Sequence, residues 1–292
     1  MKKKNGYMFF VHLFFIIFSL CVILPFFIIV MLSLSRETDI VDYGYSVIPR
    51  HFSLQAYEFL FKDVSKLFHS ILFTVVYAVL APAVTVILCS GIGYSISSKS
   101  DFALKKGVMR YLIFTMLTGA GLIPTYIIYT KIYMMGNSFL VYLLPGAVSA
   151  WTVILFRTFF SQIPYSLVEA ATIDGASQLQ VLIKVIVPMS KPIIGTVYFT
   201  NLLTKWNDWM TTLYYVTDER LYTVQYFMQK VLDSAEFMKQ AYQSIGLGAG
   251  SKFPTETLKF AMCVIAVLPV FAAFPYLQKY FSKGMAVGAV KE

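Results

Sequence analysis

Long runs of apolar residues, separated by short polar stretches, are the dominant pattern along this chain. Six of the runs have about 20 or more residues, the length that an α-helix needs to cross the hydrocarbon core of a bilayer. The strands of an outer-membrane barrel alternate apolar and polar residues over roughly ten positions, unlike these runs. The pattern predicts an all-α, polytopic membrane protein with six transmembrane helices, at 8–34, 68–97, 108–129, 138–160, 193–216 and 258–281.

The first run follows three lysines at positions 2–4, as the apolar core of a secretory signal peptide does. It is longer than such a core, and no small-residue cleavage site follows it. We therefore predict a retained signal anchor that forms the first span.

Composition indicates the same class of protein. Hydrophobic residues make up 58% of the 292 residues and charged residues 13%, and the mean hydropathy is +0.69, whereas soluble domains carry about 25% charged residues. The net charge of +9 is spread over the flanks of the apolar runs without a basic stripe, so it does not indicate nucleic-acid binding. Cys21, Cys89 and Cys263 lie inside predicted spans and are expected to be buried apolar residues.

The distribution of Lys and Arg predicts the orientation in the membrane. With the N-terminus in the cytoplasm, the cytoplasmic segments hold 13 of these residues and the external segments nine, and cytoplasmic loops normally carry the excess. Both termini and the loop 161–192 are then cytoplasmic, and two large loops, about 35–67 and 217–257, are external.

The two external loops are too long for simple connectors. Within the second, residues 221–232 are typical of a short amphipathic helix, and Gly246, Gly248 and Gly250 indicate irregular backbone. Two interpretations remain open: the loops form lids on their own spans, or they are docking sites for an external partner protein.

The cytoplasmic loop 161–192 carries the most specific local pattern. Pro164 suits a first helical turn, and Gly175 can adopt a positive φ that ends a helix. These residues predict one helix over 165–173 and a second over 178–187, stopped by Pro188 and Pro192. The loop is thus predicted to be a helix–turn–helix on the membrane surface, or, alternatively, an ordinary amphipathic connector.

The loop reads Glu169-Ala170-Ala171, three residues, Gly175, nine residues, and Val185-x-Val187-Pro188. This resembles the EAA loop of permease subunits in binding-protein-dependent ABC importers, with Val at the Ile and Leu positions before the proline. Segments 119–126, 157–160, 206–208 and 276–284 are similar to carbohydrate permeases of the maltose type, closest to the branch that handles complex and polyuronate-derived oligosaccharides. The resemblance covers essentially the whole chain.

The resemblance implies a single ABC-importer transmembrane domain over 1–292 in the bacterial cytoplasmic (inner) membrane, which moves a sugar by alternating access. The substrate would be an oligosaccharide, and an acidic one such as an alginate or pectin fragment is a candidate. The implied partners are a second, homologous permease in a heterodimer, two ATPase subunits, an external sugar-binding protein and membrane lipid. The implied ATPase-coupling residues are Glu169, Ala170, Ala171, Asp174, Gly175 and Pro188. Small Ala170 and Ala171 would admit a close partner, and Glu169 offers it a charge.

No phosphate-binding loop G-x-x-x-x-G-K-[ST] occurs in the chain, nor a metalloprotease or hydrolase signature. We expect a non-catalytic pore subunit without catalytic or metal-binding residues, whose partner ATPase uses ATP and Mg. Two other classes of membrane protein would require different features. An ion-coupled secondary transporter would need repeated interrupted helices and more intramembrane carboxylates, and a membrane-embedded enzyme would need a catalytic constellation within its spans.

An ionisable residue inside a span is costly and indicates function. The fifth predicted span contains Lys205, Trp206, Asn207, Asp208 and Trp209. Lys205 and Asp208 are three residues apart on the predicted helix, so one interpretation is a structural ion pair. The other is a polar lining of the translocation path, where tryptophan stacks on sugar rings and Asn and Asp bind hydroxyls. The resembling family commonly has a small residue at Lys205, which suggests a cation for an acidic sugar.

The third predicted span offers a second candidate part of this path. Pro124 is expected to kink the helix, and Tyr126, Tyr129 and Tyr133 follow at helical spacing. These tyrosines are either packing residues or sugar contacts.

Overall fold

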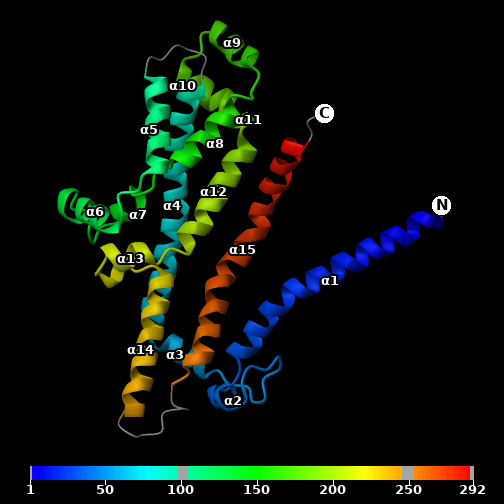
Figure 1. Ribbon diagram of the computed structural model, residues 1–292, viewed down its shortest axis with the longest axis vertical. Helices are drawn as coiled ribbons and strands as arrows, with labels where there is room; N and C mark the ends of the chain where they lie inside the picture. The colour runs from blue at the N-terminus through cyan, green and yellow to red at the C-terminus, as the bar shows by residue number, and fades with distance from the viewer. Residues whose placement is uncertain (1, 98–103, 245–252, 290–292) are drawn as a thin grey trace. The chain divides into compact units, whose positions relative to one another are not determined.

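The computed structural model describes residues 2–97, 104–244 and 253–289 (Figure 1). Apart from one isolated antiparallel bridge between Ser35 and Phe52, the regular structure of these residues is helical, as predicted. The chain divides into two compact units. The first consists of Met1–Leu67 and Phe227–Val270, and the second of Phe68–Tyr226 and Phe271–Glu292.

The first unit holds the chain from the N-terminus to the start of α4 and most of the last two helices. Its elements are α1 (Lys2–Ser33), α2 (Glu37–Tyr43), α3 (Gln55–Leu60), η1 (Phe61–Asp63), the greater part of α14 (Val224–Ser244) and the first part of α15 (Thr255–Ala289).

The second unit holds the remaining helices, many of them short. They are α4 (Val64–Ser97), α5 (Lys105–Leu117), α6 (Leu122–Ile127), η2 (Ile128–Ile132), α7 (Leu140–Leu143), α8 (Ala150–Phe160), α9 (Tyr165–Ile173), α10 (Gln178–Val181), η3 (Leu182–Ile186), α11 (Val187–Met189), α12 (Lys191–Trp206), α13 (Met210–Tyr215) and η4 (Glu219–Leu221).

Three stretches of described helix are long and apolar enough to cross a membrane, namely Met8–Ser33, Gln55–Ser97 and Thr255–Ala272. They correspond to the first, second and sixth predicted spans. Two pairs of helices, Lys105–Leu117 with Leu122–Ile132 and Gln178–Met189 with Lys191–Trp206, bring the number to five if each bent pair is one span. The six continuous helices of the prediction are therefore not all present.

The third predicted span breaks earlier than expected. The helices on either side of the break meet at 118°, and Gly121 has a φ of +81°, a conformation that glycine adopts without steric cost. Pro124 was predicted to kink the helix, but it lies in the first turn of α6, where an N–H is not needed. The prediction of a kink at Pro124 was therefore wrong.

The fourth predicted span, 138–160, is also interrupted. Only α7 and α8 are helical, and Pro145 and Gly146 lie between them. Gly146 has a φ of +76°, and proline disfavours helix at the residue before it. The remaining apolar helix, Ala150–Phe160, is shorter than a membrane span.

In the first unit, the buried carboxylate of Glu37 fixes the start of α15. Glu37 is 1% exposed and accepts hydrogen bonds from the backbone N–H groups of Glu256 and Thr257, both at 2.9 Å. It also accepts from the hydroxyls of Thr255 and Thr257, at 3.2 and 2.8 Å. The first N–H groups of a helix lack intrahelical partners, and its positive end attracts a carboxylate. The segment after α1 is thereby tied to the sixth predicted span.

The amphipathic helix predicted at 221–232 begins later and is longer than expected. It is α14, which runs from Val224 to Ser244. The backbone N–H of Val224 donates to the hydroxyl of Thr74 at 2.8 Å, which fixes its first residue. Gly246, Gly248 and Gly250 lie outside the described residues.

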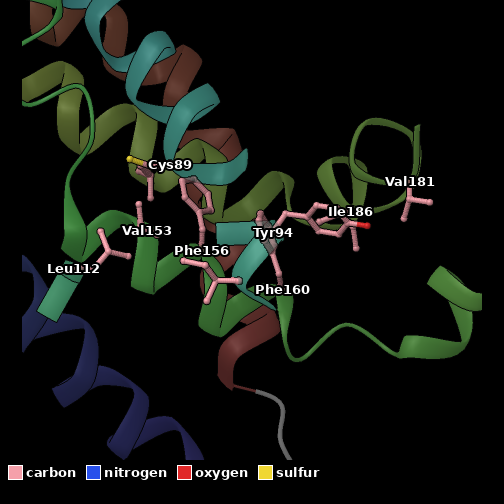
Figure 2. Packing of buried hydrophobic residues seen from close by; sticks show 10 residues of the cluster. Cys89, Tyr94, Leu112, Val153, Phe156, Phe160, Val181 and Ile186 are labelled. Carbon is pink, nitrogen blue, oxygen red and sulfur yellow. The ribbon is translucent and has the colours of Figure 1, made fainter. Parts of the chain in front are cut away.

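A cluster of buried residues holds the second unit together at the end that carries α9 (Figure 2). Phe156 of α8 is fully buried and stacks on Phe160 at 5.5 Å between ring centroids. The cluster combines residues from α4, α5, α8 and the segment from α10 to α12, namely Cys89, Tyr94, Ile96, Leu112, Val153, Phe156, Phe160, Val181, Ile186 and Val197. Cys89 is buried as predicted, but Cys21 and Cys263 are exposed on their helices, which corrects that expectation.

Candidate functional site

The first helix of loop 161–192 is confirmed in position and in its ending. The helix α9 covers Tyr165–Ile173, and Gly175 has a φ of +82°. The N–H of Ala176 donates to the carbonyl of Ala171 at 2.9 Å, and the N–H of Gly175 to that of Thr172 at 3.0 Å. This pair of hydrogen bonds is the Schellman motif, which a glycine after the last helical residues favours.

The second helix starts where predicted and ends two residues later. Ser177 and Gln180 form a capping box: the Ser177 hydroxyl accepts from the Gln180 N–H at 3.4 Å, and Gln180 Oε1 accepts from the Ser177 N–H at 2.8 Å. The helix passes through a π-helical turn, η3, and continues through Pro188 to Met189.

Neither Pro188 nor Pro192 stops that helix, so this part of the prediction was wrong. Each proline occupies the first turn of a helical segment, Pro188 in α11 and Pro192 in α12, where the missing N–H has least effect. The chain turns by 82° between Met189 and Lys191, and α12 then leads away from the loop.

The loop presents two different sides. Val168, Ala171 and Ala176 pack against the second unit's buried cluster, whereas Glu169 and Ala170 are exposed. The two alanines that were expected to admit a partner therefore differ. Ala171 packs against the buried cluster, and only Ala170 is exposed. Asp174, Gly175 and Pro188 are exposed as well.

Large apolar side chains accompany Glu169 and Ala170 on the loop surface. Ile173 is 80% exposed, Leu179 64%, Ile183 56% and Leu167 41%. Several large apolar side chains exposed on one loop are typical of a surface that a partner or a membrane covers. We call these four residues with Glu169 and Ala170 the loop surface.

The loop is connected to α4 by a direct hydrogen bond. The hydroxyl of Tyr94, near the end of α4, donates to Gln178 Oε1 at 2.9 Å. Beside it lies a cavity of about 190 Å³ lined by Tyr94, Ser97, Phe160, Ser161, Ile163, Tyr165, Val168 and Ile186. The loop is therefore tied to α4 by the bond to Tyr94 as well as by packing.

The fifth predicted span is interrupted at its polar residues. The helix α12 ends at Trp206, and α13 begins at Met210. Asp208 was expected on one face of a continuous helix with Lys205, with Trp206 and Trp209 beside them; the break makes that expectation wrong. The Asp208 carboxylate instead binds the first turn of α13, because it accepts from the Thr211 N–H at 3.0 Å and the Thr211 hydroxyl at 2.6 Å.

A residue from another helix completes the surroundings of Asp208. The hydroxyl of Tyr77 in α4 donates to Asp208 Oδ2 at 2.7 Å. Lys205 Nζ lies 5.7 Å from the centre of the Tyr77 ring, within the range of a cation–π contact. No carboxylate of the described residues lies within 4.0 Å of that nitrogen, so the expected ion pair between Lys205 and Asp208 does not form.

The other polar residues of the break differ in their exposure. Trp206 is 5% exposed and Trp209 38%. Asn207 is exposed, and its Oδ1 accepts from Gln225 Nε2 at 3.4 Å. The break therefore presents Asn207 and Trp209 at the surface of the second unit, with Lys205 and Asp208 partly buried beside them.

The tyrosines of the third predicted span meet a tyrosine of α13. The ring of Tyr126 stacks on Tyr215 with centroids 5.9 Å apart and an interplanar angle of 18°, and Tyr129 meets the same ring edge-on at 5.9 Å. The ring centroids of Tyr133 and Tyr129 are 6.3 Å apart. Tyr126 is 41% exposed, so the group forms an open aromatic surface.

The side chain of Asn137 binds the start of the second large predicted external loop, 217–257, directly after α13. Its Oδ1 accepts from the N–H groups of Thr217 and Asp218, at 2.6 and 3.0 Å. The hydrogen bonds from the exposed Arg220 guanidinium hold the pKa of Asp218 below its ordinary value. These polar contacts add to the packing of Val216 and Tyr222 in a buried cluster with Tyr77 and Tyr142.

Comparison with known proteins decides the family. Residues 59–287 match the family model of the binding-protein-dependent transport system inner membrane component. The chain belongs to this family. It is a permease subunit of an ABC transporter.

Relatives match this permease over nearly their whole length. The polygalacturonan/rhamnogalacturonan transport system permease protein YtcP of Bacillus subtilis (strain 168) is 32% identical over 278 residues, 95% of this chain and 96% of the relative. The arabinooligosaccharides transport system permease protein AraQ of the same organism is 25% identical over 287 residues, 96% and 94% of the two chains.

A solved structure has the same fold as the permease. It is a chain of a bacterial ABC transporter involved in the import of the acidic polysaccharide alginate, with a TM-score of 0.77 at 24% identity over 96% of this chain and 98% of that chain.

Family membership confirms a non-catalytic membrane subunit whose ATPase is a separate chain. An external binding protein is a further partner of such a system, and the inner membrane is its location. The alternatives of an ion-coupled secondary transporter and a membrane-embedded enzyme do not agree with this family.

Sequence reasoning missed several residues that the structure brings to loop 161–192 and to the break of the fifth predicted span. Tyr77 and Tyr94 lie on one apolar helix, and nothing in their local pattern distinguishes them from packing residues. Tyr215 lies far along the chain from Tyr126 and Tyr129. The apolar residues of the loop surface did carry a signal, since Ile173 and Leu179 interrupt an otherwise polar segment next to Asp174 and Ser177.

Proposed function

We propose that the loop surface of the permease is its contact with the ATPase subunit, and that this contact transmits ATP-driven motion to the spans. The observation that carries the proposal is the two-sided loop: Val168 and Ala171 pack inward on the buried cluster, while Glu169, Ala170 and Ile173 face outward. A loop that is fixed on one side and apolar on the other can both bind a partner and move with it. Asp174 and Gly175 form the turn between its two helices, and Pro188 lies in the first turn of α11.

The proposed substrate is an acidic oligosaccharide, such as a fragment of a pectin or of alginate. The support is the similarity to a permease named for polygalacturonan and rhamnogalacturonan and to a transporter involved in alginate import. The proposed path includes Lys205, Asn207, Asp208 and Trp209 at the break of the fifth span. It also includes the tyrosine surface of Tyr126 and Tyr129, which follows Pro124. Trp206 is buried and packs beneath the break rather than lining the path.

The proposed assembly rests on membership of the binding-protein-dependent transport family. This chain, as a single transmembrane domain, pairs with a second homologous permease in a heterodimer, and two ATPase subunits bind the cytoplasmic loops. The sugar-binding protein docks on the external loops 35–67 and 217–257. Both termini then lie in the cytoplasm, and ATP and Mg are bound by the ATPase subunits.

The proposed mechanism is alternating access. Closure of the ATPase pair on ATP displaces both coupling loops, and the displacement reaches α4 through the bond between Tyr94 and Gln178. The path then opens toward the binding protein, and hydrolysis returns the transporter to the inward-facing state. The partners must bind the two states with different affinity for this cycle to run.

Co-purification from solubilised membranes tests the proposal. Tagged wild-type permease should elute with an ATPase and a second permease, identified by mass spectrometry, and the eluate should hydrolyse ATP. Glu169→Lys reverses the charge of the loop surface and should remove the ATPase while membrane insertion persists. Glu58→Lys is the matched control, because Glu58 is an exposed helical residue of the external segment. Retention of the full complement of ATPase by Glu169→Lys would contradict the proposal.

A further inference from the structure

Lys205 occupies an unusual place for a cation. It lies near the middle of the fifth predicted span, whereas every other Lys or Arg of the predicted spans lies close to a span end. A charged side chain costs most at the centre of a bilayer, and those that are kept there line paths or bind a counter-charge. The position therefore requires either a partner within the chain or a ligand.

The carboxylate of Asp208, three residues away, is hydrogen-bonded to other groups. Both oxygens of Asp208 accept hydrogen bonds, Oδ1 from the Thr211 N–H and Oδ2 from the hydroxyls of Thr211 and Tyr77. These bonds hold the carboxylate at the first turn of α13, out of ion-pair distance from Lys205 Nζ. The ammonium group instead faces the ring of Tyr77 at 5.7 Å.

We propose that Lys205 binds a carboxylate of the transported oligosaccharide, and that Tyr77 is the positioning residue that keeps Asp208 from pairing with Lys205. The inference rests on the proposed function, since it assumes a sugar path through the break of the fifth span. Lys205 would then be the residue that selects a negatively charged sugar.

The neighbours of Lys205 fit a sugar acid. Asn207 is exposed, and its amide donates to the Leu203 carbonyl at 2.9 Å and accepts from Gln225 Nε2 at 3.4 Å. The second amide N–H and the second lone pair of Oδ1 are left for sugar hydroxyls. Trp209, 38% exposed, offers an aromatic face to the apolar side of a pyranose ring. An ammonium group, an amide and an indole within one short segment match the carboxylate, the hydroxyls and the ring of a uronate residue.

The arrangement also selects against neutral sugars. A partly buried ammonium group loses hydration and regains that free energy only when it meets an anion. A uronate supplies the anion, whereas a neutral sugar leaves the ammonium group unpaired. Specificity then arises from the unsatisfied charge that the wrong substrate leaves behind.

The decisive experiment compares two substrates that differ only in charge. The complete transporter, with its partner permease, ATPase and binding protein, is reconstituted in liposomes. Uptake of a galacturonate trimer is compared with uptake of the same trimer with its carboxyl groups methyl-esterified. Each variant is expressed as a ratio to the wild type for each trimer, so that any preference of the binding protein cancels.

Lys205→Met is expected to lower uptake of the acidic trimer about ten- to hundredfold, the value of a lost charge-assisted hydrogen bond. Uptake of the ester should change less than about twofold. Lys131→Met is the control, because Lys131 lies just beyond the third predicted span and its side chain is exposed. It should leave both trimers unaffected.

Tyr77→Phe tests the positioning role without removing any charge. The variant removes one of the two hydrogen bonds to Asp208 Oδ2 and leaves the one from the Thr211 hydroxyl. The less restrained carboxylate can then turn to Lys205 and compete with the substrate carboxylate. Acidic uptake should fall as in Lys205→Met, although Lys205 is still present. The double variant Tyr77→Phe with Asp208→Asn should restore acidic uptake, because an amide cannot form the competing ion pair. A merely structural role of Tyr77 would not give this rescue.

Two kinds of failure are distinguishable. Equal loss of both trimers in Lys205→Met, or no loss of either, would overturn the inference while leaving oligosaccharide import intact. A wild-type transporter that takes up the ester but not the acidic trimer would overturn the proposed substrate class and, with it, the inference.

Discussion

Gly93 of α4 and Phe156 of α8 lie in direct contact, closer than any other residue at position 93 would permit. A Cβ at Gly93 would lie 2.8 Å from the Cβ of Phe156, 3.1 Å from the backbone N of Arg157 and 3.2 Å from the carbonyl oxygen of Val153. Two of these atoms belong to the backbone of α8, and Phe156 is fully buried. The approach of the two helices therefore depends on the absence of a side chain at Gly93.

Gly93→Ala is expected to destabilise the permease by about 1–3 kcal/mol, the usual effect of overpacking a core. Gly91→Ala is the matched control on the same helix, because a Cβ there meets no atom within 4 Å. The control should keep or slightly gain stability, since alanine favours helix. Thermal unfolding in detergent measures both, and equal stability of the two variants would contradict the close contact.

Glu37→Ala is expected to loosen the start of α15. The buried N–H groups of Glu256 and Thr257 would lose their acceptor, at about 1–3 kcal/mol for each unsatisfied group. Hydrogen exchange of these two amides should become faster, as measured by mass spectrometry. Glu58→Ala, an exposed glutamate of α3, should leave the exchange unchanged. Unaltered protection in Glu37→Ala would show that the carboxylate does not hold the helix start.

Ile173→Asp is expected to weaken ATPase binding without affecting folding. The side chain is 80% exposed on the loop surface, so its replacement removes no internal packing but places a charge in the proposed apolar contact. Leu54→Asp serves as the control, because Leu54 is 58% exposed and lies outside loop 161–192, in the first predicted external loop. Co-elution of the ATPase with each tagged variant is the measurement. The loop surface would not be the contact if Ile173→Asp retained as much ATPase as the control.

Tyr94→Phe is expected to uncouple transport from hydrolysis. The variant loses the hydrogen bond to Gln178 at 2.9 Å but keeps the aromatic packing and the loop surface. The ATPase should therefore still co-purify, while sugar uptake per ATP hydrolysed falls severalfold. Tyr111→Phe, an exposed tyrosine of α5, should change neither quantity. Unchanged stoichiometry in Tyr94→Phe would mean that packing alone transmits the motion.

The local sequence pattern was sufficient to predict those elements that depend only on residues close together in the chain. The helix Tyr165–Ile173 and its turn were predictable because Pro164, Gly175 and the spacing between them act within a few residues. The long helices α1 and α4 followed from apolar length alone, since a backbone in a bilayer must satisfy its own hydrogen bonds. The EAA pattern, likewise contained in one segment, pointed to the family that the comparison with known proteins confirmed.

Tertiary contacts decided what local pattern left open. The fifth span breaks at Asn207–Trp209, where Asp208 binds Thr211 and accepts a hydrogen bond from Tyr77, 131 positions away. Nothing in the sequence near Lys205 shows that this carboxylate is already engaged. The buried cluster around Phe156, to which distant helices contribute, determines which alanine of loop 161–192 faces inward. The sequence by itself determined the class of protein, the long spans and the helix Tyr165–Ile173, because those depend on apolar length and local backbone preference. Only the folded chain decided which polar groups are paired and which remain open to a ligand, because pairing depends on residues that the fold brings together.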